Sequence, residues 1–135
     1  MASTTSLLHQ VIERLRNEFA VKDLGPLQFF LGVNVKRTNA GFFLSQSQYV
    51  EELLPRAGMV TCKPVSTPVD TKAKLSGSNG AKLADPSYYH SLAGGLQYLT
   101  ITRSDITYAV QQACLHMHDP CDSRLAFVKR ILRHV

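Results

Sequence analysis

The acidic residues of this chain are spaced so that no pair of them could hold two metal ions for phosphoryl transfer. Such chemistry needs carboxylates that place two ions about 4 Å apart, and adjacent aspartates on a tight hairpin meet that need. The sequence contains no Asp-Asp pair. Its adjacent acids, Glu51 and Glu52, would lie about 100° apart on a predicted helix, which favours a solvated helix face. We therefore predict no catalytic residue, and we assign the acids near turns and helix starts to structural roles: Asp23, Asp85, Asp105 and Asp119.

A group of cysteine and histidine side chains near the C-terminus is the strongest candidate for a metal site. Cys114 and His118 would share a helical face at i and i+4, and Cys121 could fold back toward them. Zinc prefers four tetrahedral nitrogen or sulfur ligands, but His116 would point away from this pair, and the spacing matches no common zinc motif. The favoured alternative is a core Cys114 with boundary histidines, so we predict no metal ligand.

Two adjacent glycines, Gly94 and Gly95, stand inside a stretch that otherwise has a helical pattern. The surrounding run from Leu92 to Leu96 lacks the G-x-G-x-x-G spacing and the Lys-Ser/Thr ending of phosphate loops. Each glycine costs a helix interior about 1 kcal/mol relative to alanine. Close helix packing would explain that cost, and so would close approach of a ligand. The sequence leaves both explanations open.

Composition indicates a folded protein of one domain or two small lobes, with a mild preference for polyanions. The 135 residues are 44% hydrophobic and 19% charged, which fits a globular chain rather than a disordered one. The net charge of +5 suits an acidic partner without proving one. Three cysteines without CxxC spacing favour a reduced intracellular setting, cytoplasmic or nuclear. No run approaches the ~20 apolar residues of a membrane span, and no signal-like N-terminus is present, so we expect no membrane partner.

The first half of the chain reads as helix, hairpin and helix. Apolar residues at helical spacing predict an amphipathic helix over about 6–20, capped by Thr5 or Ser6. Gly25-Pro26 breaks the chain, and residues 28–45 read as two strands around a turn at 38–41. A second helix is expected to start from Ser45 or Ser47, to be kinked or ended by Pro55, and to stop at Gly58. Its expected inward residues are Tyr49, Val50, Leu53, Leu54 and Ala57.

The second half reads as a linker followed by three helices. Residues 61–87 hold three of the six prolines and no sustained period. Asp85 and Pro86 form a cap and first turn for a helix that buries one face. A further helix starts near Arg103–Asp105, and Asp119-Pro120 restarts the chain. The predicted class is therefore α+β, helix-dominated, with one β-hairpin flanked by helices. The expected inward residues of the three helices are Tyr89, Leu92, Ala93 and Leu96, then Ile106, Val110, Ala113 and Met117, then Leu125, Val128, Ile131, Leu132 and Val135.

Six segments together resemble the reverse transcriptase of copia-type LTR retrotransposons. They are FAVKDLGPLQFFLGVNVKR, FLSQSQYVEELL, KPVSTPVD, SLAGGLQYLT, TRSDITYAV, and HDP followed by FVKRILRHV. Their order and spacing agree with that family over nearly the whole chain. The departures are Pro55, where the family usually keeps a good helix former, and Ser104, where it has a proline and where serine is a reasonable cap. The family's Tyr-Val-Asp-Asp motif would lie just upstream and is missing, as is the RNase H region.

The resemblance implies part of a right-hand polymerase fold. Residues 1–58 resemble the end of the palm, 59–87 the connection, and 88–135 the thumb. Phe30, Leu31, Gly32 and Val33, with Lys36 and Arg37 nearby, resemble the primer-grip hairpin that positions a primer terminus. His90, Gly94 and Tyr98 recur at i, i+4 and i+8 and resemble a thumb face that follows the minor groove of a template–primer duplex. There the glycine would admit the sugar–phosphate backbone, the histidine would donate a hydrogen bond, and the tyrosine would pack on sugar.

The expected function is a fragment of an RNA-directed DNA polymerase that keeps duplex-binding surfaces but is inactive alone. The complete family enzyme uses Mg²⁺, for which this chain has no predicted ligands. Expected partners are an RNA–DNA or DNA template–primer and the palm and RNase H parts of a parent polyprotein. One alternative is a non-catalytic module that binds nucleic acid or protein. Another is a poorly folding product that self-associates through apolar faces, because a lone two-stranded ribbon is marginal in water.

Overall fold

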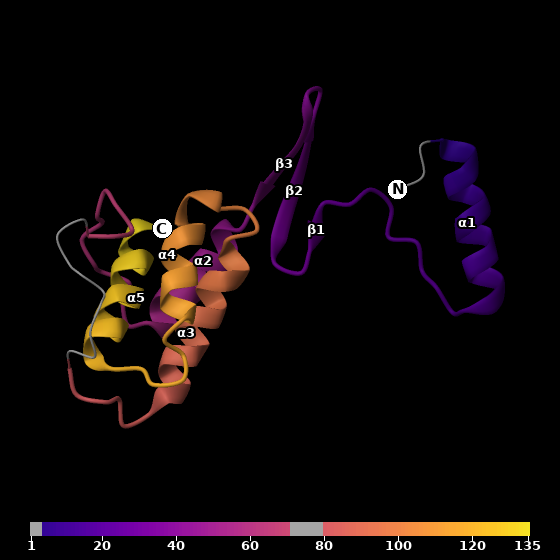
Figure 1. Cartoon of the computed structure of the whole chain (residues 1–135). Helices are drawn as coiled ribbons and strands as arrows, with labels where there is room; N and C mark the ends of the chain where they lie inside the picture. The colour runs from indigo at the N-terminus through magenta and orange to yellow at the C-terminus, as the bar shows by residue number, and fades with distance from the viewer. Residues whose placement is uncertain (1–3, 71–79) are drawn as a thin grey trace.

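The computed structural model describes residues 4–70 and 80–135. Within these ranges the chain is α+β and helix-dominated, as predicted, but its sheet has three strands where the sequence predicted two. Figure 1 shows the sheet between an isolated first helix and a group of packed helices. The elements in chain order are α1 (Thr5–Glu18), β1 (Phe29–Phe30), β2 (Val33–Thr38), β3 (Gly41–Ser45), α2 (Ser47–Arg56), α3 (Pro86–Leu99), a 3₁₀ turn η1 (Ser104–Ile106), α4 (Thr107–Cys114) and α5 (Asp122–His134).

The sheet is an antiparallel meander in the order β1-β2-β3. The predicted turn at 38–41 is confirmed, since Thr38 pairs with Gly41 and its Oγ1 donates a hydrogen bond of 3.1 Å to the Gly41 carbonyl. The additional strand is β1, in which Phe30 pairs with Val33. Pairing of β1 requires a second tight turn, at Leu31-Gly32, which the sequence analysis treated as continuous strand.

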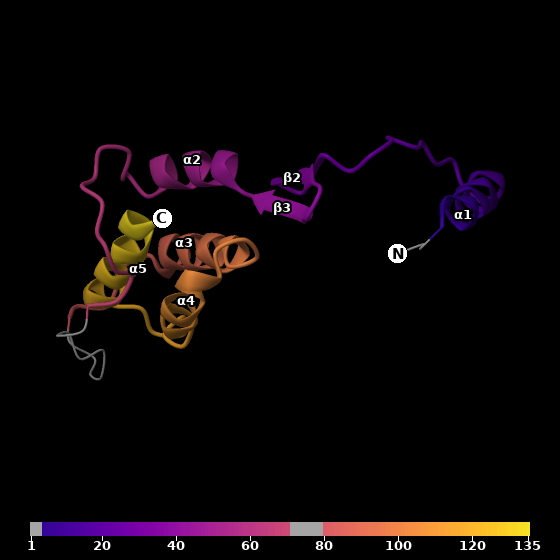
Figure 2. The same ribbon diagram turned by 90° about the horizontal axis from the view of Figure 1, so that it is seen from above.

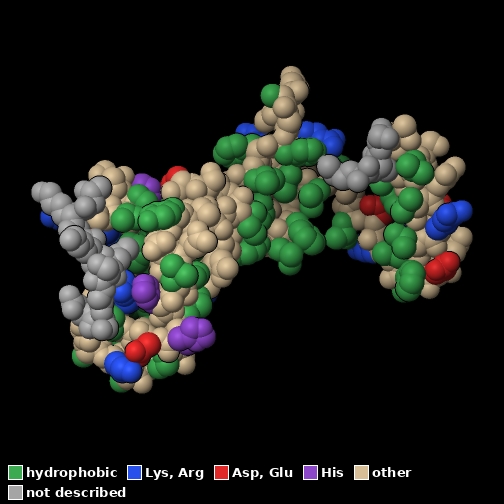
Figure 3. All heavy atoms as spheres, viewed as in Figure 1, with side chains coloured by type: hydrophobic (Ala, Val, Ile, Leu, Met, Phe, Trp, Pro, Cys, Tyr) green, Lys and Arg blue, Asp and Glu red, His purple; other side chains and the backbone are tan. Residues whose placement is uncertain are grey.

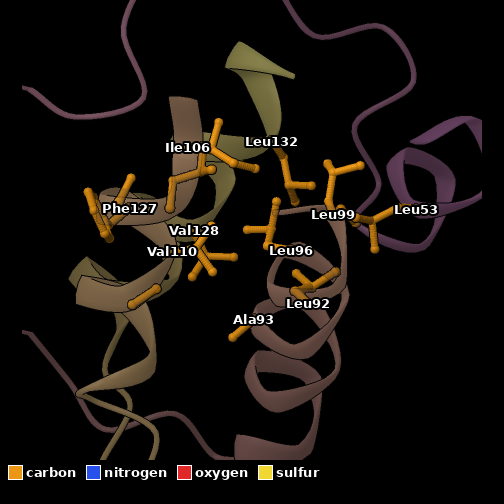
Figure 4. Packing of buried hydrophobic residues seen from close by; sticks show 14 of the residues in the cluster. Leu53, Leu92, Ala93, Leu96, Leu99, Ile106, Val110, Phe127, Val128 and Leu132 are labelled. Atoms are coloured by element: carbon orange, nitrogen blue, oxygen red, sulfur yellow. The ribbon is translucent and has the colours of Figure 1, made fainter. Parts of the chain in front are cut away.

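The hydrophobic core lies among α2, α3, α4 and α5 (Figure 4). Predicted inward positions of α3, Tyr89, Leu92 and Leu96, are fully buried, and the Tyr89 hydroxyl donates to the Ala113 carbonyl at 2.8 Å. Leu53 of α2 is 1% exposed, so this helix shares the core of the later helices. The buried residues of this hydrophobic cluster are Leu53, Ala57, Met59, Tyr89, Leu92, Ala93, Leu96, Leu99, Ile106, Ala109, Val110, Ala113, Phe127, Val128, Ile131 and Leu132.

Gly58 ends α2 as predicted. It adopts a positive φ of 65°, its N–H bonds to the Pro55 carbonyl, and the Met59 N–H bonds to the Leu54 carbonyl, both at 2.9 Å. These two bonds define a Schellman motif, which satisfies carbonyls left free at a helix end. Pro55 lies inside α2, and the helix ends one residue later at Arg56. Proline has no N–H to donate to the carbonyl four residues earlier, so one helical hydrogen bond is missing in this last turn.

Of the predicted helix starts, the one before α3 is confirmed. Asp85 accepts a hydrogen bond of 2.8 Å from the Ser87 N–H, and Pro86 opens the helix. The other predicted caps were wrong by one or two residues, because the cap positions are Thr4, Gln46 and Cys121, none with a side-chain cap bond. The incorrectly assigned caps are Thr5 or Ser6 for α1, Ser45 or Ser47 for α2, Asp119-Pro120 for α5, and Ser104, which is instead the first residue of η1.

Helix α4 is shorter than predicted. It ends at Cys114, and residues 115–118 form turns, so Met117 lies beyond the helix. Residues Val110 and Ala113 are buried as expected, and Ile106 is buried from η1. The helical spacing of Cys114 and His118 on which the metal-site candidate depended is therefore absent.

Part of the predicted linker lies along α5. The Val65 N–H donates to the Arg133 carbonyl at 3.0 Å, and Arg133 Nε donates to the Lys63 carbonyl at 2.8 Å. Farther on, Lys82 forms an isolated antiparallel bridge with Cys121. Residues 71–79 of the same segment lie outside the described residues.

Helix α1 forms where predicted but stands apart from the packed helices in both views (Figures 1 and 2). None of its residues is buried. The side chains of its apolar stripe, and of the residue after it, are 43–62% exposed: Leu7, Leu8, Val11, Leu15 and Phe19. Helix α1 therefore contributes nothing to the core of α2–α5.

Candidate nucleic-acid interface

The predicted primer-grip residues form the tight turn between β1 and β2. Leu31 and Gly32 have positive φ values of 49° and 79°, while Phe30 and Val33 pair on either side of them. Two central residues with positive φ are typical of a type I′ hairpin turn. A leucine in this conformation is uncommon, since its Cβ crowds the backbone.

Tyr98 of α3 joins this turn to the helical core. Its hydroxyl donates a hydrogen bond to the Leu31 carbonyl, and its ring meets the Tyr49 ring edge-on, with 5.1 Å between ring centres. A Cβ on Gly32 would lie 3.8 Å from the Tyr98 ring. Two predicted groups, one on the hairpin and one on α3, are thus brought together. The ring of Tyr98 was expected to pack on sugar, and its hydroxyl is engaged within the chain.

The two glycines of α3 have different surroundings. A Cβ built on Gly95 would lie 2.7 Å from Leu53 Cδ1 and 3.3 Å from the Tyr49 hydroxyl, and that hydroxyl donates to the Gly95 carbonyl at 3.2 Å. A Cβ on Gly94 would meet nothing within 4 Å. Close packing of α2 on α3 therefore explains Gly95. It does not explain Gly94, which is exposed.

His90 lies on the exposed side of α3, one turn before Gly94. Its Nε2 lies 2.7 Å from the Met117 carbonyl. A carbonyl only accepts, so Nε2 carries the proton and donates it here. The hydrogen bond that the sequence analysis expected His90 to offer to a duplex is made to the chain itself.

Lys36 and Arg37 lie farther along β2, near its turn with β3. Both are exposed, and the Arg37 guanidinium lies 5.1 Å from the centre of the Phe42 ring. At about 3.3 Å per residue, they lie roughly 10 Å or more along the strand from Val33. The structure therefore divides the predicted set into a turn that contacts α3 and a basic pair near the opposite hairpin tip.

The cysteine and histidine candidates do not form a metal site. Within residues 4–70 and 80–135, no group of three or more His, Cys, Asp or Glu side chains could hold a metal ion, Mg²⁺ included. Burial raises the pKa of the Cys114 thiol. The Cys121 sulfur lies 3.2 Å from the Ser123 hydroxyl, and that hydrogen bond lowers the pKa of Cys121. Among the acidic residues, Glu51 and Glu52 are exposed, and Asp23 accepts a hydrogen bond from the Gly25 N–H at 2.8 Å.

An electrostatic cluster near the start of α4 was not anticipated from the sequence. Arg103 donates from Nε and Nη2 to the two carboxylate oxygens of Asp105, at 2.8 and 2.7 Å. This pairing is the main reason that the pKa of Asp105 falls to about 2. His134 Nε2 lies 3.3 Å from the same carboxylate. In the sequence, Arg103 stands two residues before Asp105, and this spacing could have indicated the ion pair. The approach of His134 depends on tertiary packing.

Residues 1–71 match the model of a family described as reverse transcriptase (RNA-dependent DNA polymerase). The chain is 47% identical over 133 residues to an uncharacterized mitochondrial protein of Arabidopsis thaliana, covering 98% of this chain and 55% of that protein. It is 45% identical over 130 residues to the retrovirus-related Pol polyprotein from transposon RE1 of the same plant, covering 96% of this chain and 9% of the polyprotein.

A third relative is the Pol polyprotein from transposon TNT 1-94 of Nicotiana tabacum. It is 37% identical over 134 residues, covering 90% of this chain and 10% of the polyprotein. No solved structure matches. The chain thus spans about half of one relative and about a tenth of the polyproteins. Among the described residues, no helix is both long and apolar enough to cross a bilayer.

Proposed function

Because the chain belongs to the reverse transcriptase family, with Pol polyproteins of copia-type retrotransposons as relatives, we propose that it is a duplex-binding part of such an enzyme that does not polymerise alone. Residues 1–58 supply the end of the palm, 59–87 the connection and 88–135 the thumb. Since Leu53 of α2 packs against α3, the first and last parts share a core. The three cysteines, Cys62, Cys114 and Cys121, lack CxxC spacing, which supports an intracellular setting.

The observation that carries the proposal is the open position at Gly94. Its neighbour Gly95 is required by helix packing, whereas nothing in the described chain occupies the space beside Gly94. A missing side chain on an exposed helix costs about 1 kcal/mol in helix propensity. Close approach of a sugar–phosphate backbone would offset that cost. Tyr98, one turn away, connects the same helix to the Leu31-Gly32 turn, so a duplex along α3 would reach both predicted surfaces.

The test is binding of a labelled RNA–DNA hybrid by fluorescence anisotropy. Gly94→Leu should weaken binding because its side chain fills the open position. The control is Ala126→Leu, a similar enlargement at an exposed position on α5. Binding should weaken with salt in a linear log–log relation if phosphates are contacted. Equal affinity of the two variants, or no binding by the parent chain at low salt, would contradict the proposal.

A separate assay tests the proposal that the chain does not polymerise alone. The sequence contains no adjacent aspartate pair, and two-metal phosphoryl transfer depends on carboxylates that hold both ions. A primer-extension reaction with Mg²⁺ or Mn²⁺ should give no product above a blank without protein. Incorporation that survives repurification of the chain would overturn this part of the proposal.

A second candidate function, protein association, is favoured by the exposed N-terminal apolar surfaces. No residue of α1 is buried, and Phe29, Phe30 and Phe42 of the sheet are more than half exposed. Such surfaces are typical of interaction sites or of chains that aggregate. Light scattering after size exclusion measures the oligomeric state. A chain that stays monomeric at all concentrations would count against association. The packed core of α2–α5 supports folding of the helical part under either outcome.

A further inference from the structure

The tip of the β2–β3 hairpin pairs an aromatic ring with a cation on each face. In the sheet register Arg37 lies opposite Phe42, and Lys36 lies opposite Phe43. Directly opposed residues point to the same face, and successive residues point to opposite faces. One face of the tip therefore presents Arg37 and Phe42, and the other presents Lys36 and Phe43.

Both rings are open to solvent. Phe42 is 54% exposed and Phe43 is 61% exposed. Arg37 lies over part of the Phe42 ring, with its guanidinium carbon 5.1 Å from the ring centre. The bond from Thr38 Oγ1 to the Gly41 carbonyl closes the turn and holds the strands in register. The rings are thus displayed on a fixed two-stranded scaffold.

The charge carried by the hairpin itself has one sign. From Leu24 to Val50 the sequence contains no Asp or Glu, and its only Lys and Arg are Lys36 and Arg37. Figure 3 shows hydrophobic side chains gathered over the sheet with Lys and Arg beside them. A purely apolar protein partner would leave both cations without a counter-charge, whereas an anionic partner with flat apolar groups would use all four side chains.

We propose that this hairpin tip binds single-stranded nucleic acid, with bases stacked on Phe42 and Phe43 and phosphates beside Lys36 and Arg37. Aromatic platforms interleaved with cations are the physical basis of sequence-tolerant single-strand binding. Bases inside a duplex are already stacked on both faces, so these rings favour unpaired bases. The inference rests on the proposed function only in taking nucleic acid as the ligand. The proposed site is the hairpin tip and its ligand is a single strand, whereas the α3 surface is proposed to bind a duplex.

The experiment measures anisotropy of a labelled oligothymidylate of about a dozen nucleotides, a length within the range of known single-strand sites, mixed with the full chain. Phe42→Ala and Phe43→Ala should each weaken binding by roughly 5- to 150-fold, from the typical contribution of one stacked base. The control is Phe19→Ala, since Phe19 is 62% exposed but outside the hairpin. The log–log salt slope should be about −1.4 for two phosphate contacts, and Arg37→Gln should reduce it by about 0.7.

Three outcomes would overturn the inference. The folded chain could show no binding to the oligonucleotide at low salt. Binding could respond to Arg37→Gln but not to either phenylalanine variant, which would indicate attraction without stacking. The phenylalanine variants could change the oligomeric state and leave binding unchanged, which would make the rings a protein contact. The RNA–DNA hybrid distinguishes the two proposals, because Gly94→Leu should affect hybrid binding and Phe42→Ala should affect the single strand alone.

Discussion

Alanine at the two adjacent glycines of α3 should have clearly different effects on the free energy of unfolding. Replacement of a helical glycine by alanine stabilises a helix by about 1 kcal/mol. For Gly94→Ala that gain should be realised, because the new methyl group meets no atom within 4 Å. For Gly95→Ala the new methyl group would lie 2.7 Å from Leu53 Cδ1, which must move.

The magnitude for Gly95→Ala follows from the surroundings of Leu53. Its side chain is 1% exposed, so it cannot move outward without disturbing the core. Overpacking of this kind typically costs about 1–3 kcal/mol. After the helix-propensity gain, Gly95→Ala should range from roughly neutral to about 2 kcal/mol less stable. The difference between the two variants should therefore be about 1–3 kcal/mol.

Urea unfolding followed by circular dichroism measures both free energies of unfolding, with the parent chain as reference. The comparison is well matched, since both variants add one methyl group to the same helix. If Gly95→Ala stabilised the chain as much as Gly94→Ala, Leu53 would not be packed on α3 as described. A clear loss of stability in Gly94→Ala would mean that its face of the helix is covered.

Three further changes test other contacts. Asp105 has its pKa lowered to about 2 in the folded chain, so its pair with Arg103 contributes stability above the unfolded pKa near 4 and loses it as pH falls toward 2. Because the pair is substantially exposed, Asp105→Asn should cost at most about 1 kcal/mol at neutral pH. When the free energy of unfolding is measured at decreasing pH, the variant should lose less stability than the parent chain. An equal pH dependence in parent and variant would rule this out. Tyr98→Phe removes the hydrogen bond to the Leu31 carbonyl and should cost about 0.5–1.5 kcal/mol, with faster amide exchange in the β1–β2 turn; unchanged exchange there would refute the link. Gly58→Ala forces a side chain into a positive φ and should cost about 1–2 kcal/mol by thermal melting, whereas an unaltered melt would contradict the Schellman end of α2.

Sequence reasoning succeeded where a residue type requires one local geometry. Gly58 ended α2 at a positive φ, and Asp85 capped α3. The turn at Leu31-Gly32 was missed because leucine rarely adopts a positive φ, so only Gly32 hinted at a break. The third strand was missed with it.

Recognition of site residues from sequence spacing was less complete. His90, Gly94 and Tyr98 do follow one another on one side of α3. However, His90 bonds to the Met117 carbonyl and Tyr98 to the Leu31 carbonyl. These bonds join segments far apart in the chain, and neither periodicity nor motif spacing contains that information. The duplex-binding role of the three residues stays a prediction.

The isolation of α1 has a consequence for how the chain opens. A helix of 14 residues with none of them buried gains little from packing and is marginal in water, so its backbone should interconvert between helix and coil on the submicrosecond timescale. Its amides would then exchange with solvent almost independently of the remaining helices. Tryptic cleavage at Arg14, Arg16 or Lys22 should consequently release the N-terminal segment while the α2–α5 unit stays intact.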